Sequence, residues 1–217
     1  MAIRVFLADD HGVVRDGLRL LLEAQGDITV VGDAADGREA VRQVQELGPD
    51  VVVMDIAMPE LNGIEATYQL REMCPAIQIV ILSIHSATEH ILRALRAGAR
   101  GYLLKESAGT EVVEAVRAVH AGRRYLSQRI SDTVIDGYLR QDPGDRVRSP
   151  LESLSPRERE VLQLVVEGKT SAEIGKILFL SQKTVETYRS RLMQKVGING
   201  LPGLVKFALQ HGLIPLE

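Results

Sequence analysis

The chain has 217 residues, of which 45% are apolar and 25% are charged, as in an ordinary soluble globular protein. This composition excludes collagen-like, disulfide-scaffold and largely disordered chains, and the length favours one large domain or two small ones. The formal net charge of −3 argues against a general polyanion-binding protein.

The charge is unevenly distributed along the chain. Residues 1–125 carry 13 basic and 18 acidic groups, residues 126–149 are neutral, and residues 150–217 carry 9 basic and 7 acidic groups. This asymmetry suggests two parts with different tasks. The single Cys74 cannot form an internal disulfide, and no run approaches the ~18 apolar residues of a membrane-spanning helix, so we expect a cytoplasmic protein without a membrane segment.

The first 125 residues alternate short β-rich runs with segments of helical periodicity. This strict alternation predicts a doubly wound, five-stranded parallel sheet with helices on both faces. The expected strands are 3–8, 28–31, 51–54, 77–82 and 101–104, and the expected helices are 13–25, 38–47, 64–73, 89–97 and 110–120.

Polar and charged residues follow four of these strands. Asp9 and Asp10 end the first strand and Asp55 ends the third, and the carboxyl ends of parallel strands meet at one edge of such a sheet. Three carboxylates at close range repel one another unless a cation lies among them, and oxygen ligands favour a hard ion such as Mg2+. Ser83 and Lys105 follow the fourth and fifth strands and offer a hydroxyl donor and a positive charge for a phosphate.

The strand signal disappears after about residue 125. Residues 126–149 mix charges with a turn cluster at 142–145 that is typical of a linker, although 130–139 could form a short helix. Residues 150–217 then read as four helices. Two capping boxes, at Ser155 and Thr170, mark the first two starts, Ser181 caps a third helix that runs to about 196, and an apolar stripe over 204–209 indicates the fourth. The tight connection before Ser181 is typical of a helix-turn-helix unit.

The third of these helices is amphipathic. Its expected core face carries Val185, Tyr188, Leu192 and Val196, and the opposite face is polar and basic. A charged helix face is usually only the solvated side of the helix, so this feature alone does not establish nucleic-acid binding.

The first 122 residues resemble the receiver domain of bacterial two-component response regulators, which has a flavodoxin-like fold. The resemblance is carried by Asp9-Asp10, by the segment 54–63 around Asp55, by Ser83 and by the segment 101–105. It implies that Asp55 is the phospho-acceptor and that Asp9, Asp10, Asp55 and the backbone carbonyl of Ala57 bind Mg2+. It further implies that Ser83 and Tyr102 form a switch pair and that Lys105 contacts the phosphate.

Residues 150–215 resemble the helix-turn-helix of the LuxR/NarL/FixJ family, through the segments 154–162, 172–175 and 181–188. This implies sequence-specific DNA binding with helix 182–196 in the major groove. The residues expected to hold phosphates are Lys183, Thr184, Arg189, Arg191 and Lys195. The residues expected to read base edges are Glu186, Thr187 and Ser190.

The sequence therefore predicts a receiver at 1–125, a linker at 126–149 and a DNA-binding domain at 150–217 of a transcriptional regulator that is not an enzyme. The expected partners are a sensor histidine kinase, double-stranded DNA and, after phosphorylation, a second copy of the chain.

Two other functions stay open at this point. The receiver could be a docking module that is never phosphorylated, or Asp55 could serve a Mg2+-dependent phosphohydrolase. The second needs a general acid near Asp55, and Ala57 offers none. A nucleotide-binding site is not expected, because no P-loop or GxGxxG motif opens any helix.

Overall fold

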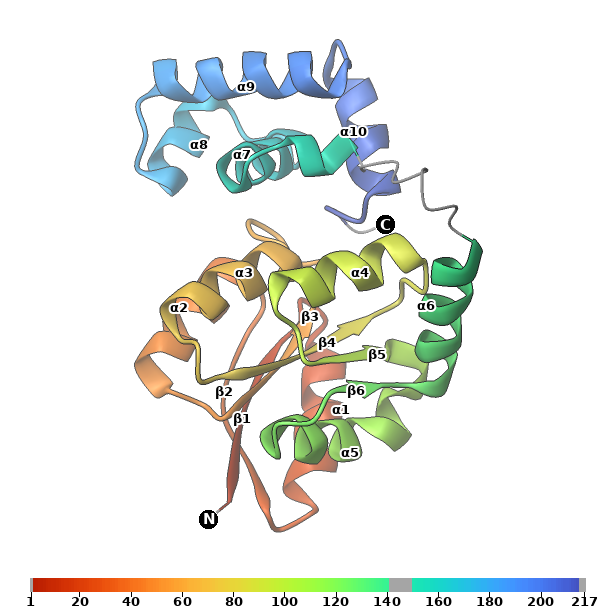
Figure 1. The fold of residues 1–217 in the computed structure, drawn as a ribbon. Coiled ribbons are helices and arrows are strands. Elements are labelled where there is room, and N and C mark those ends of the chain that lie inside the picture. The colour runs from red at the N-terminus through yellow and green to blue at the C-terminus, as the bar shows by residue number, and fades with distance from the viewer. Residues whose placement is uncertain (1, 141–149, 215–217) are drawn as a thin grey trace. The chain divides into compact units, whose positions relative to one another are not determined.

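The computed structural model describes residues 2–140 and 150–214 and is shown in Figure 1. The chain divides into two compact units, Met1–Gln141 and Asp142–Glu217. None of the helices in the described part of the chain combines the length and apolar character needed to cross a membrane.

The first unit is built on a parallel sheet in the order β2-β1-β3-β4-β5-β6. Its central strands are buried on both faces, so they read as almost continuous apolar runs. The strands are β1 (Ile3–Ala8), β2 (Ile28–Ala34), β3 (Val51–Asp55), β4 (Gln78–Ser83), β5 (Gly101–Leu104) and β6 (Tyr125–Leu126).

Helices cover both faces of this sheet, as the alternating pattern predicts (Figure 1). One face packs against α2 (Gly37–Leu47), α3 (Gly63–Met73) and α4 (Thr88–Ala97), and the other packs against α1 (Gly12–Glu23) and α5 (Ala108–His120). A short 3-10 turn, η1 (Lys105–Ser107), joins β5 to α5. All five predicted helices of this unit are confirmed, with ends that shift by one or two residues.

The sheet has six strands, so the prediction of five is wrong. β6 pairs with Gly101 and Tyr102 of β5. Two residues are too few to show the alternation by which a strand is recognised in a sequence. Helix α6 (Gln128–Arg140) follows, and its Ile130 is completely buried in the core beneath α4. The first half of the interval expected to be a linker is therefore strand and helix, and the turn cluster at 142–145 lies outside the described residues.

The loop between β3 and α3 is packed unusually tightly for a connecting segment. Ile56, Met58 and Leu61 are fully buried. The backbone of Gly63, at the start of α3, lies so close to Asp55 that an added Cβ would sit 1.9 Å from the carbonyl oxygen of that residue. This contact fixes the loop that follows Asp55 against the end of β3.

The second unit consists of a 3-10 turn and four α-helices. The turn is η2 (Pro150–Ser153), and the helices are α7 (Pro156–Val166), α8 (Ser171–Leu178), α9 (Gln182–Val196) and α10 (Leu201–Gln210). Both predicted capping boxes are confirmed, at Ser155 with Glu158 and at Thr170 with Glu173. Ser181 accepts a hydrogen bond from the backbone N–H of Thr184 and so caps α9.

We expect Gly63→Ala to destabilise the first unit by about 2 kcal/mol, because the methyl group overlaps backbone that cannot move aside cheaply. Urea unfolding measures the change.

Gly17→Ala is the matched control. Gly17 lies in the middle of α1 with open space around its Cα, so the same substitution should stabilise that helix by about 0.5–1 kcal/mol. Equal effects of the two substitutions on the free energy of unfolding would contradict the close approach at Asp55.

Candidate functional site

An ion-paired cluster lies at the carboxyl ends of β1, β3 and β5. The Nζ of Lys105 lies 2.7 Å from Oδ2 of Asp9 and 2.8 Å from Oδ2 of Asp55. The two aspartates are 1% and 3% exposed, so both carboxylates are almost removed from solvent. The sequence places these three residues at separate strand ends, and the fold brings them into direct contact.

Burial sets the electrostatics of this cluster. Burial, followed by the neighbouring Asp9 carboxylate, raises the pKa of Asp55 to about 6, although Lys105 opposes the shift. Burial alone would lower the pKa of Lys105, but its contacts with Asp55 and Asp9 raise the pKa, so the amine stays protonated. The cluster therefore carries an excess of negative charge that a single lysine does not neutralise.

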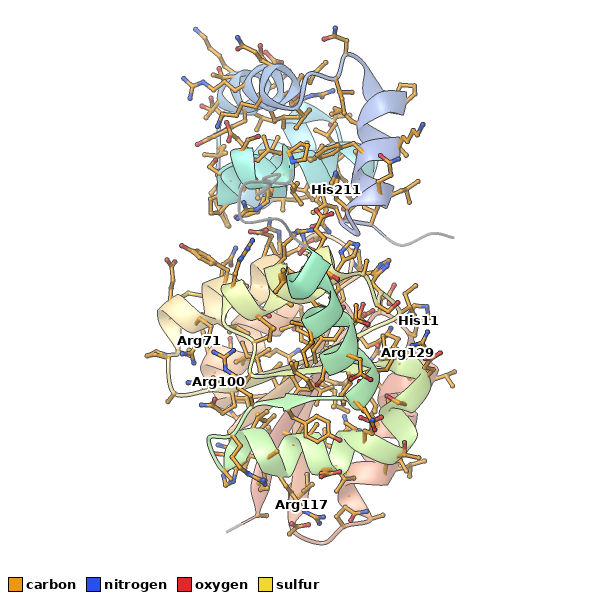
Figure 2. All side chains as sticks on the ribbon, turned by 45° about the vertical axis from the view of Figure 1, so that its right-hand side comes forward. His11, Arg71, Arg100, Arg117, Arg129 and His211 are labelled. Carbon is orange, nitrogen blue, oxygen red and sulfur yellow. The ribbon has the colours of Figure 1, made fainter. Side chains whose placement is uncertain are left out.

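Two more potential metal ligands adjoin the buried aspartates. The Nδ1 of His11 lies 2.6 Å from Oδ1 of Asp10 and 3.2 Å from Oδ1 of Asp9. Asp9, Asp10, His11 and Asp55 each offer one ligand atom within 4.8 Å of the others. His11 itself is mostly exposed, at the surface of the unit (Figure 2). Three carboxylates and one half-exposed opening suit a hard cation that keeps part of its water.

Ser83 and Tyr102 are joined through the backbone of His85. The Ser83 hydroxyl accepts a hydrogen bond of 3.0 Å from the His85 N–H, and the Tyr102 hydroxyl donates one of 2.8 Å to the His85 carbonyl. Both side chains are buried, Tyr102 completely. Burial raises the pKa of Tyr102 to about 12, so its hydroxyl keeps its proton. The loop after β4 therefore reports on the positions of both residues.

Ala57 lies two residues after Asp55, in the tightly packed loop, and is 7% exposed. Its methyl group contributes no acid, base or ligand. The buried loop therefore leaves the edge of the cluster to backbone groups and to the aspartates.

Helix α9 presents a polar face to solvent. Val185 and Leu192 are buried in the core of the second unit, with Tyr188 and Val196 partly buried beside them, as its amphipathic pattern predicts. The exposed residues of the opposite face include Lys183, Glu186, Thr187, Ser190, Arg191 and Lys195. A shallow hollow on this face is lined by Ser181, Lys183, Thr184, Thr187, Tyr188 and Arg191.

Three of the expected DNA-contacting side chains also have partners within the unit. Arg189 is half-buried and donates to the Ser171 hydroxyl at 3.1 Å, which ties α9 to α8. The Nζ of Lys195 lies 2.6 Å from the buried Glu158 carboxylate. The hydroxyl groups of Thr184 and Ser181 are 2.8 Å apart. These contacts make Arg189 and Lys195 structural residues of the unit, whatever else they touch.

Glu158 shows how one carboxylate can serve two helices. Burial alone would raise the pKa of Glu158, but the hydrogen bonds from Lys195 and Ser155 outweigh it and hold the pKa below its usual 4.5. The same side chain completes the capping box of α7 and fixes the end of α9. The sequence reveals the capping role, but not the contact with Lys195, 37 residues away.

Other residues of the site were not assigned a role from the sequence. His11 could have been noticed from its position next to the aspartate pair. Arg15 donates to the Asp9 carbonyl, and His85 links the two switch residues, but no spacing rule points to either contact.

Two family models match the chain. The model described as the response regulator receiver domain matches residues 5–117, and the model described as bacterial regulatory proteins of the luxR family matches residues 152–208. Together they cover the acidic cluster and the α7–α10 helices.

Known proteins with both parts are similar over nearly the whole chain. Oxygen regulatory protein NreC of Staphylococcus epidermidis is 37% identical over 216 residues, which is 98% of this chain and 99% of that protein. A LuxR-family response regulator from Aurantimonas sp. SI85-9A1 is 40% identical with a TM-score of 0.62, covering 64% of this chain and 99% of that one. RcsB from Salmonella enterica serovar Typhimurium, solved bound to promoter DNA with the phosphomimetic BeF3−, is 28% identical with a TM-score of 0.63, covering 97% and 100%.

We expect Asp55→Asn to stabilise the first unit at pH 7.5 by about 2 kcal/mol in the absence of divalent cations. The pKa of Asp55 is raised on folding, from 3.8 to about 6, so the cost of ionising it is absent below pH 4 and complete above pH 6. Urea unfolding in a chelator between pH 4 and 8 should show the difference shrink as the pH falls. A difference that does not depend on pH would contradict the raised pKa.

Proposed function

This chain belongs to the two-component response regulators that join a receiver domain to a LuxR-type DNA-binding domain, and we propose that Asp55 is the residue whose phosphorylation controls its binding to DNA. The observation that carries this proposal is the meeting of Asp55, Asp9 and Lys105 within hydrogen-bond distance at the end of the sheet. The phosphoryl donor is a sensor histidine kinase.

The residues of the acidic cluster fit a Mg2+ ion. Asp9, Asp10 and Asp55 would hold it through carboxylate oxygens, and the backbone carbonyl of Ala57 would be a further ligand. When bound, Mg2+ supplies charge neutralisation for an incoming phosphoryl group. The raised pKa of Asp55 supports the fit, because the cluster lacks the positive charge that an ion would provide.

The transfer itself depends on positioning and charge. An Asp55 carboxylate oxygen attacks the phosphorus atom, and the donor's leaving group departs with the electron pair of the broken bond. Lys105 already lies against Asp55, so its ammonium group is in place to pair with the phosphoryl oxygens. The tight packing of Gly63 against Asp55 limits movement of the acceptor.

The phosphate also adds acceptors for hydrogen bonds, and Ser83 is the nearest candidate hydroxyl donor in β4. Its hydroxyl now accepts from the His85 N–H, so a turn toward the phosphate would release the loop after β4. Tyr102 holds the carbonyl of the same residue. Movement of this loop changes the surface of α4, which follows it.

For the second unit we propose that α9 enters the major groove of double-stranded DNA. Lys183 and Arg191 are exposed on its outer face and suit phosphates, whereas Glu186, Thr187 and Ser190 suit base edges. Lys195 and Arg189 reach phosphates only in addition to their contacts with Glu158 and Ser171. The proposed active species is a homodimer on paired half-sites, and the RcsB complex with promoter DNA supports a DNA partner.

One observation favours a second candidate. Tyr102 is completely buried with no phosphate on Asp55, which is the position that we expect a switch tyrosine to take after phosphorylation. A receiver that holds this arrangement permanently could act as a docking module whose effect on DNA binding does not depend on phosphorylation. The two functions differ in the response of DNA affinity to phosphorylation.

Incubation with Mg2+ and acetyl phosphate should add one phosphoryl group to the full chain, detected by intact-protein mass spectrometry. Asp55→Asn should abolish the modification, because the amide is not a nucleophile for phosphorus. Asp50→Asn is the control, since Asp50 lies at the opposite end of β3 and should leave modification unchanged. Modification of the Asp55→Asn variant would sink the assignment, and unchanged DNA affinity after modification would support the docking module.

Lys183→Ala and Arg191→Ala should weaken binding to all DNA sequences alike, and each should reduce the slope of log affinity against log salt by about one. Thr187→Ala should mainly relax sequence preference. Fluorescence anisotropy at several salt concentrations measures this, with a duplex selected from a random pool by the wild type and a scrambled duplex.

Lys206→Ala provides the charge-matched control for the DNA experiment. Lys206 is exposed on α10 and lies outside α9. If it weakens binding as much as Lys183→Ala does, the placement of α9 in the groove is wrong.

A further inference from the structure

Arg15 connects helix α1 to the turn that carries the aspartate pair. Its Nη1 donates a hydrogen bond of 2.6 Å to the backbone carbonyl of Asp9, and its Nε lies 3.0 Å from Oδ2 of Asp33, at the end of β2. The Arg15 side chain is 20% exposed, so most of the guanidinium group is enclosed. One side chain therefore links α1, β1 and β2 beside the acidic cluster.

We propose that Arg15 is a positioning residue for the cation site, which sets the direction in which Asp9 and Asp10 present their carboxylates. The inference rests on the proposed function, because that function assigns these two aspartates to Mg2+. Arg15 itself does not contact the ion or the phosphoryl group.

The carbonyl that Arg15 grips belongs to the peptide bond between Asp9 and Asp10. This peptide unit is planar, so fixing its oxygen restricts the backbone rotation on both sides of it and hence the direction of both side chains. The N–H of Asp9 is held separately by the carbonyl of Ala34, at 3.2 Å. Asp9 is thus fixed on its amino side by β2 and on its carbonyl side by Arg15.

Asp33 keeps the guanidinium group in the orientation that this contact needs. A carboxylate and a carbonyl on different nitrogens of one planar fork define the plane of the group, which a lysine with a single nitrogen cannot reproduce. Arg19, one turn further along α1, pairs with the other oxygen of Asp33 at 2.5 Å. Arg19 makes no printed contact with Asp9, and therefore differs from Arg15 in the one interaction that matters here.

The charge of Arg15 and its positioning role have opposite effects on the affinity for Mg2+. A positive group beside the carboxylates repels a divalent cation, so loss of the charge alone should tighten binding. Loss of positioning should weaken it, because partners that orient metal ligands typically contribute about tenfold or more to affinity. The sign of the change in Kd therefore separates the two effects.

The experiment is a titration of the full-length protein with Mg2+ alone, followed by 1H–15N NMR. We expect Arg15→Gln to raise the Kd by about tenfold, although it removes a repelling charge. Arg15→Lys keeps the charge and loses the fork, so it should raise the Kd by a smaller factor. Arg19→Gln removes the same charge from the same helix and should leave the Kd unchanged or lower it.

A Kd for Arg15→Gln equal to or below that of the wild type overturns the proposal. If Arg15→Gln does not fold, Arg15→Lys decides: a Kd equal to the wild-type value overturns the proposal, and a raised Kd supports it. Absence of Mg2+ binding by the wild-type protein is a different result, because it rejects the proposed function and the inference falls with it.

Discussion

Lys105 holds together two buried carboxylates that would otherwise repel each other in a low-dielectric environment. A parallel sheet directs the ends of its strands to one edge, and here β1 and β3 both deliver an aspartate to it while β5 delivers the lysine. The arrangement is incomplete as an electrostatic structure, since the pKa of Asp55 remains well above its usual value. The close packing of the loop after β3 and the grip of Arg15 on the first turn oppose the tendency of these groups to separate.

The helical unit follows a related principle with fewer charges. Glu158 completes a cap at the start of α7 and binds Lys195 at the end of α9, so one buried carboxylate relates the first helix to the one that faces solvent. The outer face of α9 is thereby held rigid without using the residues at its first turns. Rigid presentation lowers the entropy lost when a helix binds a partner.

Much of this structure could be predicted from the sequence, because long periodic segments and strand ends carry strong local signals. The five longer strands, the helices and the capping boxes follow from periodicity and from side chains three residues apart. The roles of Asp9, Asp55 and Lys105 follow from topology, which places all parallel strand ends together. β6 escaped because two residues show no period, and the contacts of Lys195 and Arg15 escaped because each joins segments whose approach depends on packing. The complete burial of Tyr102 likewise depends on the elements around β5 rather than on its own strand.

β6 has a consequence for how a partner protein could recognise the first unit. Exposed edge strands are places where an extended peptide can add to a sheet through main-chain hydrogen bonds. On β5 that row of groups is already used at Gly101 and Tyr102 by β6, and Ile130 anchors the following helix in the core. A peptide could extend the sheet there only by first displacing buried structure. Recognition on this side must therefore read side chains on helix surfaces, whose arrangement can change with the state of the strand ends while the backbone ladder stays intact.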